Sequence, residues 1–426
     1  MIKVALQNLG CSKNLVDGEK ILHFLTSNGL EFTEDLTQAE IITVNTCAFI
    51  KEAQEEAIGT ILDMAQYKNN GRCEKLIVCG CFSERYREKV RQELPEVDIW
   101  AGVQDWQNVL KEVVSAKNIS TSFERRLFEP VSTQHLKIAE GCSHRCSFCV
   151  IPSIRGDYKS RTQQDILAEA NWLYQKGTRE LILVAQDTSR YGFDRNDSLV
   201  NLLQTLLSET DFPWIRMMYL HPQFVTDELL QLVASDKRIC PYFDIPLQHI
   251  ADPVLRGMDR RPLSDGIYKL INRIRSFVPD AGIRSSFILG FPGETEDHYK
   301  ELRDFIEFAR FEKLGVFPFS AEEGTKACDM RPRPGNNTVA RRCEELMAVQ
   351  REISREILES RVGSETEIII DRVSDDPDFN FEARTRLDAP EVDGKVYLNF
   401  GSFEPGTILK TRIIGASDYD LYAQEI

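Results

Sequence analysis

Three cysteines near the middle of the chain have a spacing that can bind an iron–sulfur cluster. Cys142, Cys146 and Cys149 form a Cys-x3-Cys-x2-Cys run directly after a stretch that predicts a β-strand. Cysteine thiolates normally bind a 4Fe–4S cluster four at a time, so three thiolates leave one iron without a protein ligand. An open iron can chelate the amino and carboxylate groups of S-adenosylmethionine (SAM) and pass an electron to its sulfonium. The run therefore predicts a cluster that cleaves SAM and releases a 5′-deoxyadenosyl radical.

The same run could also bind zinc or be part of a hydrophobic core. His144 lies inside the loop and could complete a zinc site as the fourth ligand. Alternatively, the three cysteines could be buried side chains that bind nothing. Both possibilities fit less well with the polar residues that follow the later predicted strands, because a βα barrel builds its binding site at the carboxyl ends of its strands.

Three further cysteines lie far apart in the N-terminal part of the chain but share one local context. Cys11, Cys47 and Cys81 are 36 and 34 residues apart, and each follows a short apolar run that predicts a strand. The carboxyl ends of parallel strands meet at one edge of an open sheet, where ligands bind. The pattern predicts that the three thiolates converge on a second 4Fe–4S cluster, again with one open iron. Three separately buried cysteines remain the alternative.

Five cysteines remain outside the two triads. Cys79 competes with Cys81 for the third position of the N-terminal triad, although alternation along a strand would turn Cys79 toward the other face of the sheet. The other four, Cys73, Cys240, Cys328 and Cys343, have no partner at a ligand spacing, and we expect them to be structural. A disulfide framework is not expected in a reducing compartment.

The pattern of apolar residues predicts an α/β protein that begins with a parallel-sheet domain at residues 1–115. Apolar runs at 4–6, 41–44 and 76–78 predict strands, and amphipathic segments at 18–28 and 53–67 predict the helices between them. This alternation is typical of βαβ units. Residues 116–133 are polar without a clear period and predict a linker.

A second βα series fills residues 134–360 and a different pattern follows it. The six strands expected in this core cover residues 136–140, 180–185, 214–220, 242–247, 283–289 and 314–319. Six βα units predict a partial (βα)6 barrel with all strand ends on one face. Short alternating runs divided by Gly and Asp turns then predict a small all-β barrel, similar to an OB fold, at residues 361–426.

Polar and glycine residues at the predicted strand ends mark a candidate cofactor pocket. Gln186 and Asp187 follow the second core strand, and the fifth strand ends in a turn that contains Gly290 and Glu294. Glycines there let the backbone approach a ligand. These residues therefore join the cysteines as candidate site residues, although a polar residue at a strand end is more often a cap or a loop residue.

Phe148, directly before the last cysteine, makes the middle run resemble the radical SAM superfamily. That resemblance implies that Phe148 lies against the adenine of SAM. It also implies that the turn from Gly290 to Glu294 lines the nucleoside pocket.

The whole chain resembles the methylthiotransferase family. The resemblance rests on Gly10 to Asp17, Val44 to Cys47, Gly80-Cys81 with Glu84-Arg85-Tyr86, Ile151 to Gly156, Gln186 to Thr188, Asp244 to His249 and Phe319 to Thr325. It implies two 4Fe–4S clusters, SAM as cofactor and a C-terminal barrel of the TRAM type. Within the family, the chain is most similar to the branch that adds a methylthio group to the β-carbon of an aspartate in the twelfth small-subunit ribosomal protein.

The transfer RNA adenosine methylthiotransferases are the closest alternative. They typically have a Gln-Met-Asn-like stretch where this chain has Ser12-Lys13-Asn14. They also tend to have a Thr-Arg-Gly-Arg-like run where this chain has Ile154-Arg155-Gly156-Asp157. Both differences favour the protein-modifying branch.

Charge gives an independent argument about the partner. The chain carries a net charge of −15, and residues 361–426 contain 7 Lys and Arg against 14 Asp and Glu, a net charge of −7. An RNA-binding barrel should be basic. An acidic barrel would instead attract a basic ribosomal protein, so direct RNA binding is not expected. The alternative is that the acidic residues only keep the domain soluble.

The remaining expectations concern mechanism, supply and location. We expect the N-terminal cluster to provide a methylated sulfur. The radical would abstract hydrogen from the substrate carbon, which then captures the methylthio group. An electron donor such as flavodoxin or ferredoxin would serve the clusters. No apolar run is long enough to span a bilayer, which predicts a cytoplasmic protein. A function of a different class is an iron–sulfur sensor, which would need no turnover of SAM.

Overall fold

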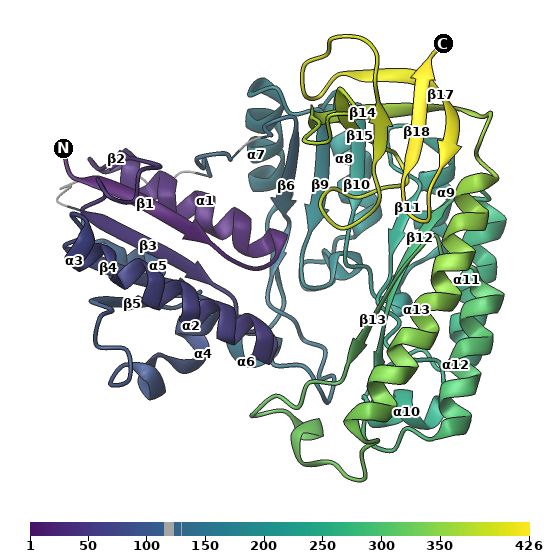
Figure 1. The fold of residues 1–426 in the computed structure, drawn as a ribbon, viewed down its shortest axis with the longest axis horizontal. Helices are drawn as coiled ribbons and strands as arrows, with labels where there is room; N and C mark the ends of the chain where they lie inside the picture. The colour runs from purple at the N-terminus through teal and green to yellow at the C-terminus, as the bar shows by residue number, and fades with distance from the viewer. Residues whose placement is uncertain (115–122, 129) are drawn as a thin grey trace. The chain divides into compact units, whose positions relative to one another are not determined.

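The computed structural model describes residues 1–114, 123–128 and 130–426, which form two compact units (Figure 1). The first unit contains the N-terminal residues up to Phe128 together with His135–Arg145 and Cys149–Trp172. The second unit contains residues 130–134, Cys146–Phe148 and Leu173–Ile426. Within the described ranges, no helix is both long and apolar enough to cross a membrane.

A five-stranded parallel sheet forms the centre of the first unit. Its order is β2-β1-β3-β4-β5, with β1 at Lys3–Asn8, β2 at Glu31–Phe32, β3 at Ile41–Thr46, β4 at Lys75–Gly80 and β5 at Ile99–Ala101. The predicted parallel sheet is confirmed. The two edge strands β2 and β5 were not predicted, because two or three residues are too short to show an alternating pattern.

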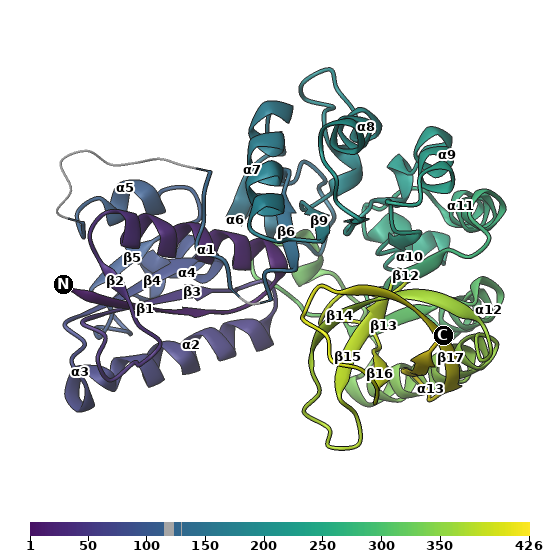
Figure 2. The same ribbon diagram turned by 90° about the horizontal axis from the view of Figure 1, so that it is seen from above.

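Helices cover both faces of this sheet (Figure 2). They are α1 at Ser12–Ser27, α2 at Lys51–Ala65, α3 at Tyr67–Asn70, α4 at Cys81–Val90 and α5 at Trp106–Leu110. Successive residues of β4 point to opposite faces. Ile77 therefore packs in one core with Leu22 of α1, whereas Val78 packs in the other core with Ile61 of α2.

The part of the middle sequence that belongs to the first unit packs into its core. It contains β7 at Ala139–Glu140 paired with β8 at Lys159–Ser160, α6 at Ile151–Arg155, and α7, which begins at Gln163. Val150 and Ile154 belong to the same hydrophobic core as Cys81 and Phe82. The radical-type cysteine loop thus leads directly into the core of the N-terminal domain.

Residues 116–122 and 129 of the segment predicted as a linker lie outside the described residues. Arg125, which is described, is buried and not a solvated linker residue. Its guanidinium forms ion pairs with Glu19 of α1 and, at 3.1 Å, with Glu169 of α7. Arg125 therefore links α1 to α7 within the first unit.

Two short parallel sheets contain the strands of the middle part of the chain, most of which belong to the second unit. One has the order β10-β9-β6 and the other β11-β12-β13. The strands are β6 at Thr133–Lys137, β9 at Glu180–Val184, β10 at Trp214–Met217, β11 at Tyr242–Asp244, β12 at Gly282–Leu289 and β13 at Lys313–Pro318. A parallel bridge between Ile215 and Ile239 carries the series from the first sheet to the second. The predicted partial barrel of six strands is confirmed.

Helices follow the strands of this partial barrel and lie on its outer side (Figure 2). They are α8 at Leu199–Glu209, α9 at Asp227–Ser235, α10 at Asp252–Gly257, α11 at Ser264–Phe277, α12 at Glu296–Ala309 and α13 at Asn336–Glu359. Most of α7, at Gln163–Gln175, belongs to the first unit. Short 3-10 turns lie at Thr188–Arg190, Pro222–Phe224 and Lys326–Asp329.

The chain ends in a closed five-stranded barrel, as predicted. Its order is β14-β15-β16-β18-β17, with β14 at Glu365–Val373, β15 at Phe381–Thr385, β16 at Val396–Leu398, β17 at Ile408–Ala416 and β18 at Leu421–Glu425. β18 was not predicted, although without it the barrel could not close. Ile369 and Ala389 pack against Ile182 and Trp214, which fixes the barrel on the core strands.

A buried ion network strengthens this junction. Glu180, at the start of β9, accepts from Arg216 Nε at 2.6 Å and from Arg384 Nη2 of β15 at 2.7 Å. All three side chains are almost fully buried. Burial acts to raise the pKa of Glu180, but the two arginines outweigh it and hold the pKa at about 2. The C-terminal barrel is therefore attached at the amino-terminal ends of the core strands.

Candidate functional site: two cysteine triads

The three N-terminal cysteines come from neighbouring strands of the parallel sheet. Cys11 follows β1, Cys47 follows β3 and Cys81 follows β4, and these strands are adjacent in the order β1-β3-β4. A Cβ atom placed on Gly10, which has a φ of +88°, would lie 2.7 Å from Cys47 Cβ. The turn before Cys11 thus contacts Cys47, and the structure brings the predicted thiols to one edge of the sheet.

Asparagine side chains tie the strand ends together. Asn14 Nδ2 donates to the carbonyl of Leu9 at 2.6 Å and to that of Thr46 at 3.3 Å. Asn45 Nδ2 donates to Asn8 Oδ1 at 2.7 Å and to the carbonyl of Asn14 at 2.7 Å. Asn14 and Asn45 are buried, so these bonds are shielded from water and hold the cysteine-bearing turns in register.

The thiols of this triad are close enough to influence each other electrostatically. Burial raises the pKa of Cys81 to about 11, and the neighbouring Cys47 and Cys11 add to this while Arg155 opposes it. Burial also raises the pKa of Cys47. At Cys11, burial acts in the same direction, but Lys13, Arg155 and the backbone amides of Asn14 and Lys13 outweigh it and lower the pKa. Cys11 precedes α1 and Cys81 begins α4, so both sulfurs also lie at helix N-termini, which favour thiolates.

Cys79 points away from the triad. It packs in the core with Val4 and Ile21, on the opposite face of the sheet from Cys81. Burial raises its pKa to about 12, which keeps the thiol protonated. The intervening Gly80 has a φ of +91°, and a Cβ there would lie 2.6 Å from both Asn45 Oδ1 and the carbonyl oxygen of Thr46. Gly80 therefore makes the turn that separates the two cysteines.

The middle cysteine loop is anchored at both ends. Cys142 N–H donates to the carbonyl of Gly156 at 3.0 Å in the first unit. In the second unit, Ser147 N–H donates to the carbonyl of Met258 at 3.0 Å, and its hydroxyl donates to that of Gly257 at 2.7 Å. Cys142 and Cys149 belong to the first unit and Cys146 to the second. None of the eleven cysteines, all of which are described, forms a disulfide.

The predicted SAM-pocket residues lie at carboxyl ends of core strands. Phe148 packs against a cluster that contains Phe291, directly after Gly290. Gln186 is half-buried and Asp187 is buried, and Asp187 accepts from the Ser189 hydroxyl at 2.6 Å. Phe148 and Phe291, which follows Gly290, thus belong to one apolar cluster in the second unit.

The carboxylate of Glu294 is bonded to its own turn and to a distant helix. Its carboxylate accepts from the Gly290 amide at 2.8 Å and from Arg342 of α13, and it lies 3.7 Å from His249 Nε2. A carboxylate that is fully buried and bonded in this way holds the turn in shape. A Cβ on Gly290 would lie 2.6 Å from Val339 Cγ2, which explains the glycine at this position.

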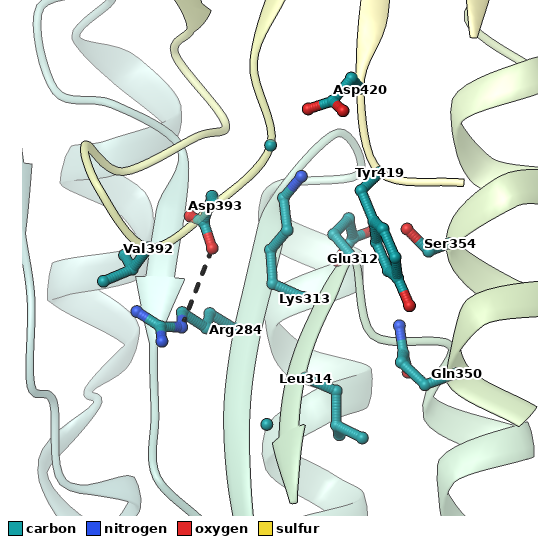
Figure 3. Close-up of a pocket in the computed structure, with 12 residues that line it drawn as sticks. Arg284, Glu312, Lys313, Leu314, Gln350, Ser354, Val392, Asp393, Tyr419 and Asp420 are labelled. Atoms are coloured by element: carbon teal, nitrogen blue, oxygen red, sulfur yellow. Dashed lines mark ion pairs between the residues drawn. The ribbon is translucent and has the colours of Figure 1, made fainter. Parts of the chain in front are cut away.

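A polar cavity of about 380 Å³ lies elsewhere in the second unit (Figure 3). Arg284 and Lys313 line it from the starts of β12 and β13, and Tyr419 and Asp393 line it from loops of the C-terminal barrel. Arg284 Nε lies 3.8 Å from Asp393, the ion pair marked in Figure 3. The cavity contains no cysteine and lies at the amino-terminal strand ends, so it is not the predicted cofactor pocket.

Three family descriptions match successive parts of the chain. Residues 3–102 match the uncharacterized protein family UPF0004, residues 136–306 the radical SAM superfamily and residues 362–426 the TRAM domain. Ribosomal protein uS12 methylthiotransferase RimO of Citrifermentans bemidjiense is 42% identical, covering 99% of this chain and 98% of that protein. The protein of the same name in Clostridioides difficile is 40% identical, over 99% and 98%.

This chain belongs to the ribosomal protein uS12 methylthiotransferase family.

Two solved structures resemble the fold of this chain, although their sequence identity to it is low. The radical SAM methyltransferase TsrM from Kitasatospora setae has a TM-score of 0.55 at 13% identity, covering 77% of this chain and 74% of that one. The cobalamin-dependent SAM radical enzyme OxsB has a TM-score of 0.50 at 14% identity, covering 82% of this chain and 56% of that one. These likenesses concern the fold alone.

Two arginines of this family member were not predicted as site residues. Arg155 Nη2 lies 3.3 Å from Cys81 Sγ, and Arg260 Nη1 lies 3.8 Å from Cys146 Sγ. Both guanidinium groups are largely buried. Arg155 stands in the motif that carried the resemblance, but its partner lies 74 residues away in sequence, so no local pattern could have indicated its role.

Proposed function

We propose that the chain is a radical SAM methylthiotransferase that adds a methylthio group to the β-carbon of an aspartate in ribosomal protein uS12. The observation that carries the proposal is the convergence of Cys11, Cys47 and Cys81 at the end of the sheet, in a chain that also contains the Cys-x3-Cys-x2-Cys run. Relatives of that name match nearly the full length of this chain. This membership of the family supports the same reaction and does not favour a transfer RNA substrate.

The family implies 4Fe–4S clusters and SAM, and the donor sets of this chain fit them. We assign one cluster to Cys11, Cys47 and Cys81 and the other to Cys142, Cys146 and Cys149, because thiolates are the usual ligands of such clusters. With these groups bound, the middle centre supplies a 5′-deoxyadenosyl radical from SAM and the N-terminal centre supplies the sulfur.

The chain's own residues would position SAM and exclude water. Phe148, Gln186, Asp187 and Gly290 would line the SAM pocket, and the packing of Phe148 against the cluster that contains Phe291 supports this. Glu294 would act through Gly290 by holding the backbone of the turn, since its carboxylate is already bonded to that amide. A dry apolar wall protects a radical from side reactions with solvent.

We further propose that the C-terminal barrel binds the basic substrate protein through a surface that we call the aromatic face, formed by Phe379, Tyr397 and Tyr422. Tyr397 and Tyr422 are register partners on β16 and β18, with ring centroids 6.0 Å apart. Phe379 lies 4.8 Å from Tyr397 and 5.5 Å from Tyr422. The strand neighbours of Tyr397 and Tyr422 belong to the barrel core, so these two rings face outward. All three rings are half-buried.

Three carboxylates and one lysine influence Tyr397 of the aromatic face. Burial raises the pKa of Tyr397, and the charges of Asp420, Glu382 and Asp376 add to this while Lys395 opposes it. Stacked aromatic rings on a small barrel can bind nucleic-acid bases, but that mode needs cationic flanks to attract the phosphates. Aromatic rings with acidic flanks instead attract Lys and Arg side chains through cation–π and ionic contacts. The surroundings therefore favour a basic protein.

A binding measurement tests the aromatic face. Substituting Asp375→Lys, Asp376→Lys and Asp378→Lys together should raise the Kd for purified uS12 by about tenfold or more. The matched control makes the same charge change on α13 with Glu344→Lys, Glu352→Lys and Glu359→Lys, and should change the Kd far less. Equal effects of both sets would show that only overall charge matters, and tighter binding of a transfer RNA than of uS12 by the unaltered chain would contradict the assignment.

The reaction itself is tested in cells with and without this gene. Mass spectrometry of ribosomal proteins should show that uS12 loses a methylthio group when the gene is deleted, while digested transfer RNA is unchanged. Loss from transfer RNA would establish the alternative substrate, and no loss from either pool, together with no SAM cleavage by the purified protein, would favour a sensor. The proposal also places the protein in the cytoplasm with its ribosomal substrate, supplied with electrons by a flavodoxin or ferredoxin.

A further inference from the structure

Arg155 is a buried cation with four partners in the first unit. Its side chain is 1% exposed. Nη2 lies 3.3 Å from Cys81 Sγ and 3.3 Å from Asn14 Oδ1. Nη1 donates to Asp17 Oδ2 at 3.0 Å and to Glu140 Oε1 at 2.9 Å. A guanidinium held by two carboxylates cannot leave the sulfur by a simple rotation, because it would lose charge-assisted hydrogen bonds.

The charges around Arg155 are balanced. Lys137 forms ion pairs with the same two carboxylates, Asp17 and, at 2.7 Å, Glu140. Two cations thus face two anions in a nearly dry site. Because Lys137 also neutralises these carboxylates, Arg155 is not their only counter-ion. Its Nη2 is directed at the Cys81 sulfur.

The position of Arg155 in the chain links it to the other triad. α6 begins two residues after Cys149 and ends at Arg155. Val150 and Ile154, on the same short segment, pack in the core that contains Cys81 and Phe82. At a helical rise of about 1.5 Å per residue, the six residues from Cys149 to Arg155 span roughly 9 Å. A rigid, packed segment therefore runs from one ligand loop to the sulfur of the other triad.

We propose that Arg155 is a positioning residue for the N-terminal centre: its hydrogen bond to Cys81 stabilises the reduced form of that centre, and its place at the end of α6 sets how closely the loop of Cys149 approaches it. The inference rests on the assignment of Cys81 as a cluster ligand under the proposed function. A cation beside a ligand sulfur favours the form with more negative charge, and hydrogen bonds to sulfur are a known control of cluster potential.

Arg260 provides a matched control in the second unit. It lies 3.8 Å from Cys146 Sγ through Nη1, and its Nη2 donates to the carbonyl of Pro246 at 2.5 Å. It has the same side chain beside a thiol of the other triad. Changes at Arg155 should thus affect the N-terminal centre, whereas changes at Arg260 should not.

The experiment measures the reduction potential of the N-terminal centre by EPR-monitored titration. The full-length chain carries Cys142→Ala, Cys146→Ala and Cys149→Ala, so that only one cluster is assembled. Into this background we would introduce Arg155→Met, Arg155→Lys and Arg260→Met. A further variant combines Arg155→Met with Asp17→Asn, which removes the contact with sulfur but keeps the charges balanced if Arg155→Met alone fails to fold.

The potential should become more negative in Arg155→Met and in the charge-balanced variant. It should shift less in Arg155→Lys, which keeps the charge but lacks the planar fork, and remain unchanged in Arg260→Met. Loss of iron from Arg155→Lys with an unchanged far-UV circular dichroism spectrum would also support a positioning role. A wild-type potential in the charge-balanced variant, or an equal shift in Arg260→Met, would overturn the inference. Failure of the background chain itself to bind iron would instead refute the cluster assignment.

Discussion

The two cysteine triads provide the same three thiols in opposite ways. Cys142, Cys146 and Cys149 are gathered by eight residues of one loop, so their proximity is a property of the local sequence. Cys11 and Cys81 are 70 residues apart and come together only because β1, β3 and β4 are adjacent and parallel. The N-terminal centre therefore depends on the folding of a whole sheet, whereas the middle one depends on how its loop is anchored.

The arginines beside the two triads are also held by different kinds of partner. Arg155 reaches Cys81 from a segment far along the chain and is held by Asp17 and Glu140. Arg260 is held by one backbone carbonyl, and its Nε has no hydrogen-bond partner among the described residues. Two charged groups therefore hold the arginine beside the N-terminal triad, whereas a neutral carbonyl holds Arg260.

Replacing one candidate ligand in each triad should have the largest effect on activity and should distinguish the roles of the two centres. Cys146→Ala should reduce 5′-deoxyadenosine formation to background, because the open-iron centre is lost. Cys47→Ala should leave SAM cleavage intact but abolish methylthio transfer to uS12. Liquid chromatography with mass spectrometry measures both products in one reaction. Continued transfer by Cys47→Ala would contradict the role of the N-terminal centre, and continued cleavage by Cys146→Ala that of the middle one.

A change at the barrel junction should weaken the second unit without touching either triad. Glu180→Gln leaves Arg216 and Arg384 buried without their carboxylate, and should lower the free energy of unfolding by about 3–5 kcal/mol. Chemical denaturation measures the loss, with the exposed Glu209→Gln as control. Iron bound by Cys11, Cys47 and Cys81 should be unchanged at ambient temperature. An effect no larger than that of Glu209→Gln would show that this network contributes little.

Substituting the strand-end glycines should affect one triad at a time. Gly80→Ala puts a Cβ 2.6 Å from the carbonyl of Thr46 at a φ of +91°, and Gly141→Ala puts one 2.2 Å from the carbonyl of Asp157 at +74°. Each strain should cost about 1–3 kcal/mol. Iron analysis in chains that retain one triad should show a loss from the N-terminal centre for Gly80→Ala only, and from the middle centre for Gly141→Ala only. Equal losses from both would mean that the centres do not assemble independently.

Lowering the pH should destabilise the second unit through protonation of Glu180. Burial acts to raise the pKa of this carboxyl, but Arg216 and Arg384 lower it from 4.5 to about 2. A carboxyl whose pKa is depressed in the folded state stabilises the fold above pH 4.5 and loses that contribution as the pH falls toward 2. Stability measured by denaturation across this range should fall less steeply in Glu180→Gln. An unchanged slope would assign the acid sensitivity to other groups.

Cys79→Ala should have the smallest effect. Cys79 is buried in the core on the far face from Cys81, so the change should cost only packing and leave the iron content of the N-terminal centre unchanged. Iron and sulfide analysis checks this against Cys81→Ala, which should lose the cluster. A loss of iron in Cys79→Ala equal to that in Cys81→Ala would mean that the ligand lies on the other face of β4.

Much of the fold followed from local patterns, and the exceptions have physical causes. The three long inner strands of the N-terminal sheet were predicted because each contains a short run of apolar residues. β2 and β5 are too short for such a pattern, and β18 follows a polar turn, so its pairing with β17 decides its conformation. The bonds of the Glu294 carboxylate to Arg342 and to the Gly290 amide were not predicted, because Arg342 lies on a helix far along the chain.

Residue types and short spacings were enough to establish which chemistry is available: thiolates at spacings that fit iron, glycines before them, and an acidic C-terminal barrel. Those features can be recognised in the chain because they depend on residue type and on short-range geometry. The folded molecule was needed to show that Arg155 contacts Cys81, that Cys79 faces away and that Phe379, Tyr397 and Tyr422 share a face. These facts depend on strand order and helix packing between residues far apart in the chain, and no local pattern contains that information.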